Sequence, residues 1–169
     1  MTIIISVVGK SNSGKTTFIE NLIPEIKRKG FSVGVVKHSH HDINIDKEGK
    51  DSWRHQKAGA DTVMVVSPQK VAMVKQVATE VSLDELAVYF GDLDLVITEG
   101  YKRGDKPKIE IFRPEAHHSP FCLGNDDLVA LVTDAALVTD VPLFALNNYE
   151  GVAVFIVNRF LSGKDKEPE

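Results

Sequence analysis

The stretch IIISVVGKSNSGKT, residues 3–16, decides the fold of this 169-residue chain. Its first six residues are β-branched and apolar except for Ser6, as in a strand that is buried on both faces of a sheet. The rest fits the pattern G-x-x-x-x-G-K-[ST] of a phosphate-binding loop. A helical apolar pattern follows over residues 16–29 and ends at Gly30. A strand, this loop and a helix in this order predict a P-loop nucleotide-binding site.

Each residue type in the loop has a chemical reason. Glycine lets the backbone wrap a phosphate, and consecutive N–H groups at a helix N-terminus attract the anion. Lys15 would reach the β and γ phosphates, and the Thr16 hydroxyl would bind Mg²⁺. The predicted nucleotide-binding residues are Gly9, Lys10, Ser11, Asn12, Ser13, Gly14, Lys15, Thr16 and Thr17.

The remaining apolar runs predict the fold class. Short runs at 33–36, 93–97 and 128–132 are typical of buried parallel strands, and 63–67 with 71–75 favour an antiparallel hairpin. Residues 108–111 alternate as a half-exposed strand would. A capping box at Ser82–Glu85 opens a second helix, and a third covers 152–160. We predict an α/β, P-loop NTPase-like three-layer sandwich with a mostly parallel sheet and an antiparallel hairpin extension, as one domain over 1–161 with a polar tail at 162–169.

Composition and charge exclude several function classes. The chain has 20 Lys and Arg against 24 Asp and Glu, a net charge of -4, which gives no overall electrostatic support for nucleic-acid binding. A single cysteine, Cys122, excludes a disulfide framework and favours the cytoplasm. No apolar run approaches 18 residues, so we expect no membrane association.

Glu99 is the second candidate of the site. In a parallel sheet, ligands lie beyond the carboxyl ends of the strands. In the stretch 93–100, Asp94 opens the predicted strand and Glu99 ends it, so only Glu99 would face the phosphates. There its carboxylate would hold Mg²⁺ or orient an attacking water, and we predict Lys15 and Glu99 as catalytic and Thr16 and Glu99 as the magnesium side. The alternative is a surface glutamate.

Charged residues follow the predicted second strand. Lys37 and Lys50 would neutralise phosphate, while Asp42 or Asp46 would approach Mg²⁺. A charged surface loop and a metal site of His38, His40 and His41 remain alternatives. Asp51 or Ser52 would cap a short helix over 53–58 that ends at Gly59.

Five stretches together resemble the MobB family of molybdopterin-guanine dinucleotide biosynthesis adapter proteins, over most of residues 3–160. They are the P-loop, KHSHHD (37–42), DKEGKDS (46–52), KAGA (57–60) and EGYK (99–102). The resemblance implies a homodimer that binds GTP, has weak GTPase activity with Mg²⁺, and is a partner of the guanylyltransferase that attaches GMP to molybdopterin. It also implies a family segment near the phosphates, comprising Lys37, His38, His41, Lys50, Asp51 and Lys102. Asn12 stands where the family often has glycine.

Two further stretches leave alternatives open. The loop from Lys102 to Lys108 would grip a phosphorylated pterin or an acidic partner, or it is a solvated hairpin tip. Asp134 follows a buried strand, where P-loop GTPases often keep a guanine-binding carboxylate, but the usual Asn-Lys is missing. The other function classes that we weigh are a small-molecule P-loop kinase and a His-rich metallochaperone NTPase.

Overall fold

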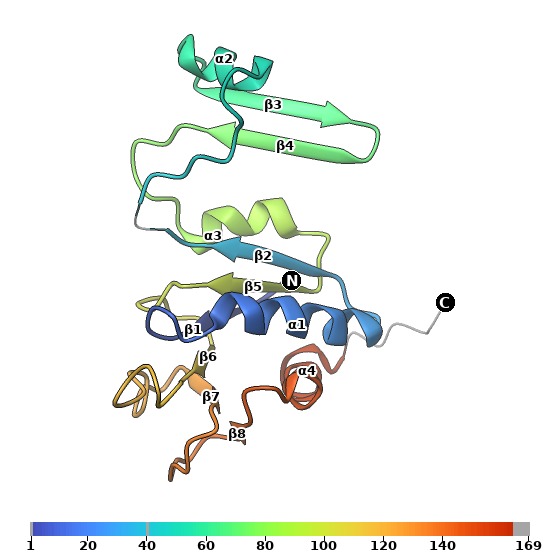
Figure 1. Cartoon of the computed structure of the whole chain (residues 1–169). Coiled ribbons are helices and arrows are strands. Elements are labelled where there is room, and N and C mark those ends of the chain that lie inside the picture. The colour runs from blue at the N-terminus through green and yellow to red at the C-terminus, as the bar shows by residue number, and fades with distance from the viewer. Residues whose placement is uncertain (1, 40, 164–169) are drawn as a thin grey trace. The chain divides into compact units, whose positions relative to one another are not determined.

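The structure, a computed structural model, describes residues 2–39 and 41–163. Its backbone groups into two compact units (Figure 1). One unit runs as far as His38 and resumes at Ala87, and the other spans Ser39–Leu86. Residues 164–169 of the predicted tail lie outside the described residues.

Within the described residues, the first unit contains a six-stranded sheet in the order β2-β5-β1-β6-β7-β8, in which every neighbouring pair is parallel. Since all strands run the same way, their carboxyl ends lie along one edge, together with the loop that follows β1. The strands are β1 (Ile3–Val8), β2 (Val33–Lys37), β5 (Leu95–Glu99), β6 (Lys108–Ile111), β7 (Leu128–Val132) and β8 (Leu143–Phe144).

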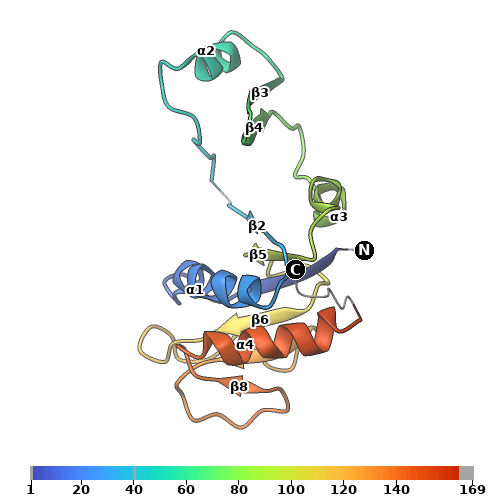
Figure 2. The same cartoon turned by 90° about the vertical axis from the view of Figure 1, so that its right-hand side faces the viewer.

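Two helices, α1 (Lys15–Arg28) and α4 (Tyr149–Ile156), lie side by side on one face of this sheet (Figure 2). Their apolar residues form one core with alternate strand residues, such as Ile5 and Ile97, because successive side chains of a strand point to opposite faces. The short 3₁₀ helix η1 (Ala87–Phe90) lies against β2 at Gly34, where an added Cβ would be 2.7 Å from the Phe90 ring. The helices therefore cover the faces of the sheet and leave its carboxyl edge, where the loop of residues 9–14 lies, uncovered.

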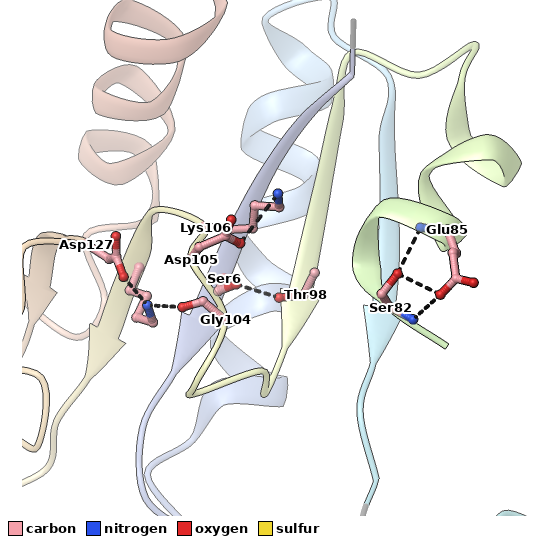
Figure 3. A network of polar contacts seen from close by, with 9 residues as sticks. Ser6, Ser82, Glu85, Thr98, Gly104, Asp105, Lys106 and Asp127 are labelled. Carbon is pink, nitrogen blue, oxygen red and sulfur yellow. Dashed lines mark hydrogen bonds and ion pairs between the residues drawn. The ribbon is translucent and has the colours of Figure 1, made fainter. Parts of the chain in front are cut away.

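The second unit has a two-stranded antiparallel sheet of β3 (Thr62–Ser67) and β4 (Lys70–Lys75). It also contains the helices α2 (Asp51–Lys57) and α3 (Leu83–Leu86). The predicted capping box is present at α3, where Ser82 Oγ donates to Glu85 Oε2 at 2.7 Å and the Glu85 amide donates to Ser82 Oγ at 3.3 Å (Figure 3). The Ser82 amide also donates to Glu85 Oε2, at 2.9 Å, and the two bonds that the carboxylate accepts, from the Ser82 hydroxyl and then from the Ser82 amide, lower the pKa of Glu85.

The α/β fold class and the antiparallel hairpin are confirmed. The prediction of a half-exposed strand at 108–111 was wrong, because β6 lies between β1 and β7 and all four of its residues are buried. The predicted cap at Asp51 or Ser52 was also wrong, since α2 starts at Asp51 with Lys50 at its N-cap and no side-chain cap bond. In the described part of the chain, no helix is long and apolar enough to cross a membrane.

Two helix boundaries differ from the predicted ones. The second predicted helix narrows to the 3₁₀ helix η1 after Leu86. The third begins at Tyr149 rather than at residue 152, because the Asn148 side chain caps it by accepting from the Gly151 amide at 3.0 Å. It then continues as a π-helix, η2, over Val157–Leu161.

Candidate nucleotide-binding site

The loop between β1 and α1 has the curled backbone that anion binding requires. Gly9, Asn12 and Gly14 have φ angles of 150°, 62° and 88°. Asparagine tolerates this region better than most residues, which explains how Asn12 replaces a glycine. At Gly9 an added Cβ would be 2.5 Å from the Ile111 carbonyl oxygen, so β6 excludes any side chain there. Alternating φ signs of this kind turn successive N–H groups toward a shared concave side.

Lys15, the first residue of α1, lies in the loop as predicted. Its Nζ donates to the Lys10 carbonyl oxygen at 2.8 Å. Its pKa is lowered, first by desolvation and then by the positive charges of Lys102 and Lys37, while Glu99 acts in the opposite direction. Cations that repel one another around one loop form a positive site, and an anion bound there would relieve this repulsion.

Glu99, at the end of β5, meets the start of α1. The Thr16 hydroxyl donates to Glu99 Oε1 at 2.8 Å, and Lys37 Nζ lies 3.4 Å from the same oxygen. Parallel pairing explains the arrangement, because Glu99 is in register with Val7 of β1 and with Lys37 of β2. The structure therefore brings together four residues that the sequence placed at the site, Lys15, Thr16, Lys37 and Glu99.

The donor set beside the loop fits magnesium. A hydroxyl and a carboxylate oxygen, the groups of Thr16 and Glu99, are hard oxygen ligands of the type that Mg²⁺ prefers next to phosphate oxygens. A transition-metal site has no such support, since the described residues contain no cluster of three His, Cys, Asp or Glu side chains suited to a metal. His40, one member of the predicted histidine set, lies outside the described residues.

His38 packs against a residue that the sequence reasoning did not single out. Its ring centroid lies 4.8 Å from that of Tyr101, and its backbone amide donates to the Glu99 carbonyl oxygen at 3.0 Å. Tyr101 has a φ of 48°, which is costly for an aromatic residue, and it follows Gly100 with a φ of 110°. The chain thus turns sharply directly after Glu99, and Lys102 comes within electrostatic reach of Lys15.

The segment after β6 also lies along the phosphate loop and was missed. Arg113 Nε donates to the Ser13 carbonyl oxygen at 3.0 Å, and His117 Nε2 lies 2.8 Å from the Ser11 carbonyl oxygen. Lys10 Nζ donates to the Ser119 carbonyl oxygen at 3.1 Å. The rule that selected Glu99, a polar residue just past the carboxyl end of a strand, would also have selected Arg113, had β6 been recognised as a central strand.

Five residues of the predicted phosphate-facing segment belong to the second unit, and their role at the phosphates stays a prediction. They are His41, Asp42, Asp46, Lys50 and Asp51. Two of them make hydrogen bonds with near neighbours in sequence: Ser39 Oγ donates to the His41 carbonyl oxygen, and Asp46 Oδ1 accepts from the Lys47 amide.

Two other candidates have structural partners. Lys108, expected in an exposed basic loop, is 1% exposed, and its Nζ donates to the Gly104 carbonyl oxygen at 2.6 Å and to Asp127 Oδ2 at 2.8 Å (Figure 3). This removes Lys108 from the residues that would grip a ligand. Asp134 Oδ1 accepts from the Leu146 amide at 2.9 Å, so one of its carboxylate oxygens already holds the chain after β8.

Comparison with known proteins gives a consistent result. The family model described as MobB, molybdopterin guanine dinucleotide synthesis protein B, matches residues 4–134. A molybdopterin-guanine dinucleotide biosynthesis adapter protein of Haemophilus influenzae is 39% identical over 157 residues, covering 92% of this chain and 88% of the relative. A protein of Escherichia coli with the same name is 39% identical over 152 residues, covering 87% of each chain.

Solved structures agree in fold. A crystal structure of molybdopterin-guanine biosynthesis protein B aligns with a TM-score of 0.73 at 32% identity and covers 95% of this chain and 100% of that chain. The crystal structure of Bacillus subtilis MobB aligns with a TM-score of 0.74 at 28% identity, covering 95% and 99%. The similarity therefore extends over nearly the whole chain.

Proposed function

This chain belongs to the MobB family of molybdopterin-guanine dinucleotide biosynthesis adapter proteins, and on that basis we propose that it binds GTP with Mg²⁺ and hydrolyses it slowly. The observation that carries the proposal is the loop of residues 9–14. Its curled backbone, the ammonium group of Lys15 and the N-terminus of α1 all favour a polyphosphate at one place.

The charges around the loop support a triphosphate. Lys15 is within electrostatic reach of two other cations, Lys37 and Lys102, and of the carboxylate of Glu99, so an unliganded site has surplus positive charge. A bound polyphosphate would compensate that charge and raise the lowered pKa of Lys15 toward its usual value. We base the choice of guanine on the family resemblance. Asp134, the candidate carboxylate for reading the base, gives little support, because one of its oxygens already accepts from the Leu146 amide.

The expected hydrolysis is slow for a structural reason. Glu99 Oε1 accepts from the Thr16 hydroxyl and lies beside Lys37 Nζ, so this carboxylate oxygen is already engaged by two partners and is poorly placed to remove a proton from water. With Mg²⁺ bound, Thr16 and Glu99 would hold the ion, which neutralises charge on the phosphates. Glu99 would then orient water instead of removing its proton.

The partners that we propose follow from the family. They are the guanylyltransferase of molybdenum cofactor synthesis and its molybdopterin substrate. The candidate contact is the chain just past Glu99, where Lys102 Nζ lies 5.3 Å from the centre of the exposed Phe121 ring. An aromatic ring beside a cation suits a phosphorylated pterin, since the ring stacks and the ammonium pairs with phosphate. The single cysteine favours a cytoplasmic setting for this work.

We further propose that two copies pair through the hairpin of the second unit. Met64 lies opposite Met73 and Val66 opposite Val71, so these four side chains share one face, and they are 55%, 38%, 67% and 65% exposed. A two-stranded hairpin is marginal in water without a packing partner. A contiguous apolar face of this kind is typical of a contact surface, and a second copy matches the homodimer that the family implies.

Calorimetric titration tests the nucleotide part of the proposal. With Mg²⁺ present, the wild-type chain should bind GTP, and Lys15→Ala should lose most of that affinity because it removes the main side-chain charge on the triphosphate. Arg28→Ala, a surface cation at the far end of α1, is the control and should bind as wild type does. No affinity for GTP, or a preference for ATP of about tenfold or more, would reject the guanine assignment. Transfer of labelled phosphate to a small acceptor rather than to water would indicate a kinase instead.

A further inference from the structure

The segment Arg113–Ser119, which follows β6, shares three hydrogen bonds with the loop of residues 9–14, two through its own side chains and one through the side chain of Lys10. Two of them involve loop carbonyl oxygens: Arg113 Nε donates to Ser13 at 3.0 Å and His117 Nε2 contacts Ser11 at 2.8 Å. A carbonyl oxygen only accepts, so His117 must carry its proton on Nε2 in this contact. The third contact runs the other way, from Lys10 Nζ to the Ser119 carbonyl oxygen.

The segment is folded so that both donors come from one turn. The amides of Ala116 and His117 donate to the Arg113 carbonyl oxygen at 3.1 and 3.0 Å. Both donor residues are partly buried. The Arg113 guanidinium lies against Gly14, where an added Cβ would be 3.1 Å from Nε. The fold therefore sets the position and packing of the Arg113 and His117 side chains.

The direction of a carbonyl group fixes the direction of the next amide. In a planar trans peptide, C=O and N–H point in opposite directions. A donor that holds the Ser13 carbonyl therefore turns the Gly14 N–H away from that donor. His117, through the Ser11 carbonyl, does the same for the Asn12 N–H. These are amides of the kind that cradle the β phosphate in a P-loop.

We propose that Arg113 and His117 are positioning residues for the bound polyphosphate, acting through the amides of Gly14 and Asn12. This inference rests on the proposed nucleotide binding and extends it to two residues outside the loop. The role needs a hydrogen-bond donor at Nε of residue 113, and it does not need the positive charge. That separates it from an arginine that contacts phosphate directly.

A matched pair of substitutions tests this role. Glutamine places its amide nitrogen where Arg113 has Nε. Methionine is nearly as long as glutamine but has no hydrogen-bond donor. Arg113→Met should bind GTP and GDP about ten- to hundredfold more weakly, by the same factor for both, since both carry a β phosphate. Arg113→Gln should stay within about threefold of wild type. His117→Gln should behave as wild type, and His117→Ala should weaken both nucleotides.

Calorimetry with GTP, GDP and pyrophosphate, alongside thermal unfolding of the ligand-free protein, separates the outcomes. Arg28→Met is the control for loss of an arginine elsewhere on the chain. If Arg113→Met binds as tightly as wild type, the positioning role is rejected while the proposed function stands. If Arg113→Gln loses as much affinity as Arg113→Met, the positive charge matters and the backbone mechanism is rejected. The glutamine variant alone gives this result, so it holds even where the methionine variant is poorly folded. A wild-type chain that binds neither GTP nor pyrophosphate rejects the proposed function and this role with it.

Discussion

Single side chains at the site do two tasks each, and Glu99 is the clearest case. Its Oε1 accepts the Thr16 hydroxyl at 2.8 Å and lies 3.4 Å from Lys37 Nζ, so one carboxylate oxygen joins residues from β2, β5 and α1. A magnesium ion bound beside Thr16 would compete for that oxygen. With the proposed ion bound, Glu99 would couple it to the two strands, and we therefore expect its charge to matter more to turnover than to nucleotide affinity.

Glu99→Gln should keep GTP binding within a few-fold of wild type and lower the rate of hydrolysis by about tenfold or more, because a neutral amide positions metal and water poorly. The measurement is phosphate release at saturating GTP and Mg²⁺. Glu150→Gln, at the exposed start of α4, is the matched control. Wild-type turnover in the Glu99 variant would remove Glu99 from the reaction.

Cys122 should be inert to thiol reagents in the folded protein. It is 2% exposed, and burial, followed by the nearby Glu110 charge, raises its pKa from 9.0 to about 11. At pH 8 we expect negligible reaction with Ellman's reagent until denaturant is added, when one thiol per chain should react. Rapid reaction of the native protein would contradict the buried placement.

The same pKa shift of Cys122 makes the free energy of unfolding depend on pH. The folded chain keeps the Cys122 proton to a higher pH than the unfolded chain, so this group lowers the free energy of unfolding as pH rises from 9.0 to about 11. Denaturant unfolding across that range should show a steeper loss for wild type than for Cys122→Ala. Equal slopes would mean that the thiol has the same pKa in both states.

At the scale of the element, β6 is where sequence and structure differ most. Its pattern Lys-Ile-Glu-Ile indicated one exposed face, yet all four residues are buried. The two charges are paired with groups in the loops before and after the strand: Lys108 with Asp127 and Gly104, and Glu110 with the amides of Phe121 and Cys122 at 2.8 and 2.9 Å. Alternation shows only that two side chains are polar, and their buried partners come from loops that no local pattern predicts.

Asp127→Ala should destabilise the protein by about 2–3 kcal/mol, since it leaves the buried Lys108 ammonium with only the Gly104 carbonyl oxygen among these partners. The figure is below that for a fully buried pair because Asp127 is 39% exposed. The midpoint temperature of thermal unfolding should fall by roughly 5–10 °C. Lys108→Met, which removes the charge itself, should stay within about 1 kcal/mol of wild type.

If the aspartate variant melts as wild type does, the ion pair contributes nothing and the burial of Lys108 needs another explanation. A large loss in Lys108→Met, equal to that of Asp127→Ala, would instead show that the lysine stem is needed for packing.

The elements predicted well have local signals. The first strand, the P-loop and α1 each have their own residue pattern, and the capping box at Ser82 forms the bonds expected of it. Arg113 was missed because its importance depends on β6 lying beside β1, a neighbour relation that only the folded sheet supplies. The start of α4 was placed late because the Asn148 cap precedes the apolar run that signalled the helix.

At the scale of the whole molecule, the chain divides its work between two units. The first supplies the parallel sheet and the candidate nucleotide-binding loop of residues 9–14, and the second supplies the hairpin whose apolar face is exposed. The sequence allowed the hairpin to be predicted, but it did not reveal that both strands would expose apolar residues. That fact appears only when Val66 and Val71 are seen opposite each other in a two-stranded sheet.

Val66→Lys should convert a dimer to monomers, since it places a charge on the proposed contact face. Gln69→Lys adds the same charge at the hairpin turn and should leave the dimer intact. Sedimentation velocity at micromolar concentration distinguishes the two masses. A monomeric wild type, or a dimeric Val66→Lys variant with wild-type affinity, would exclude this face as the contact.

We propose that the amides after β1 hold a nucleotide phosphate, and a crystal structure with a non-hydrolysable GTP analogue and Mg²⁺ would show whether they do. We predict the β phosphate within hydrogen-bond distance of the amides of residues 12–16, Lys15 Nζ moved from the Lys10 carbonyl to the phosphates, and Mg²⁺ against the Thr16 hydroxyl. An analogue bound elsewhere at saturating concentration, with residues 9–14 empty, would contradict the account.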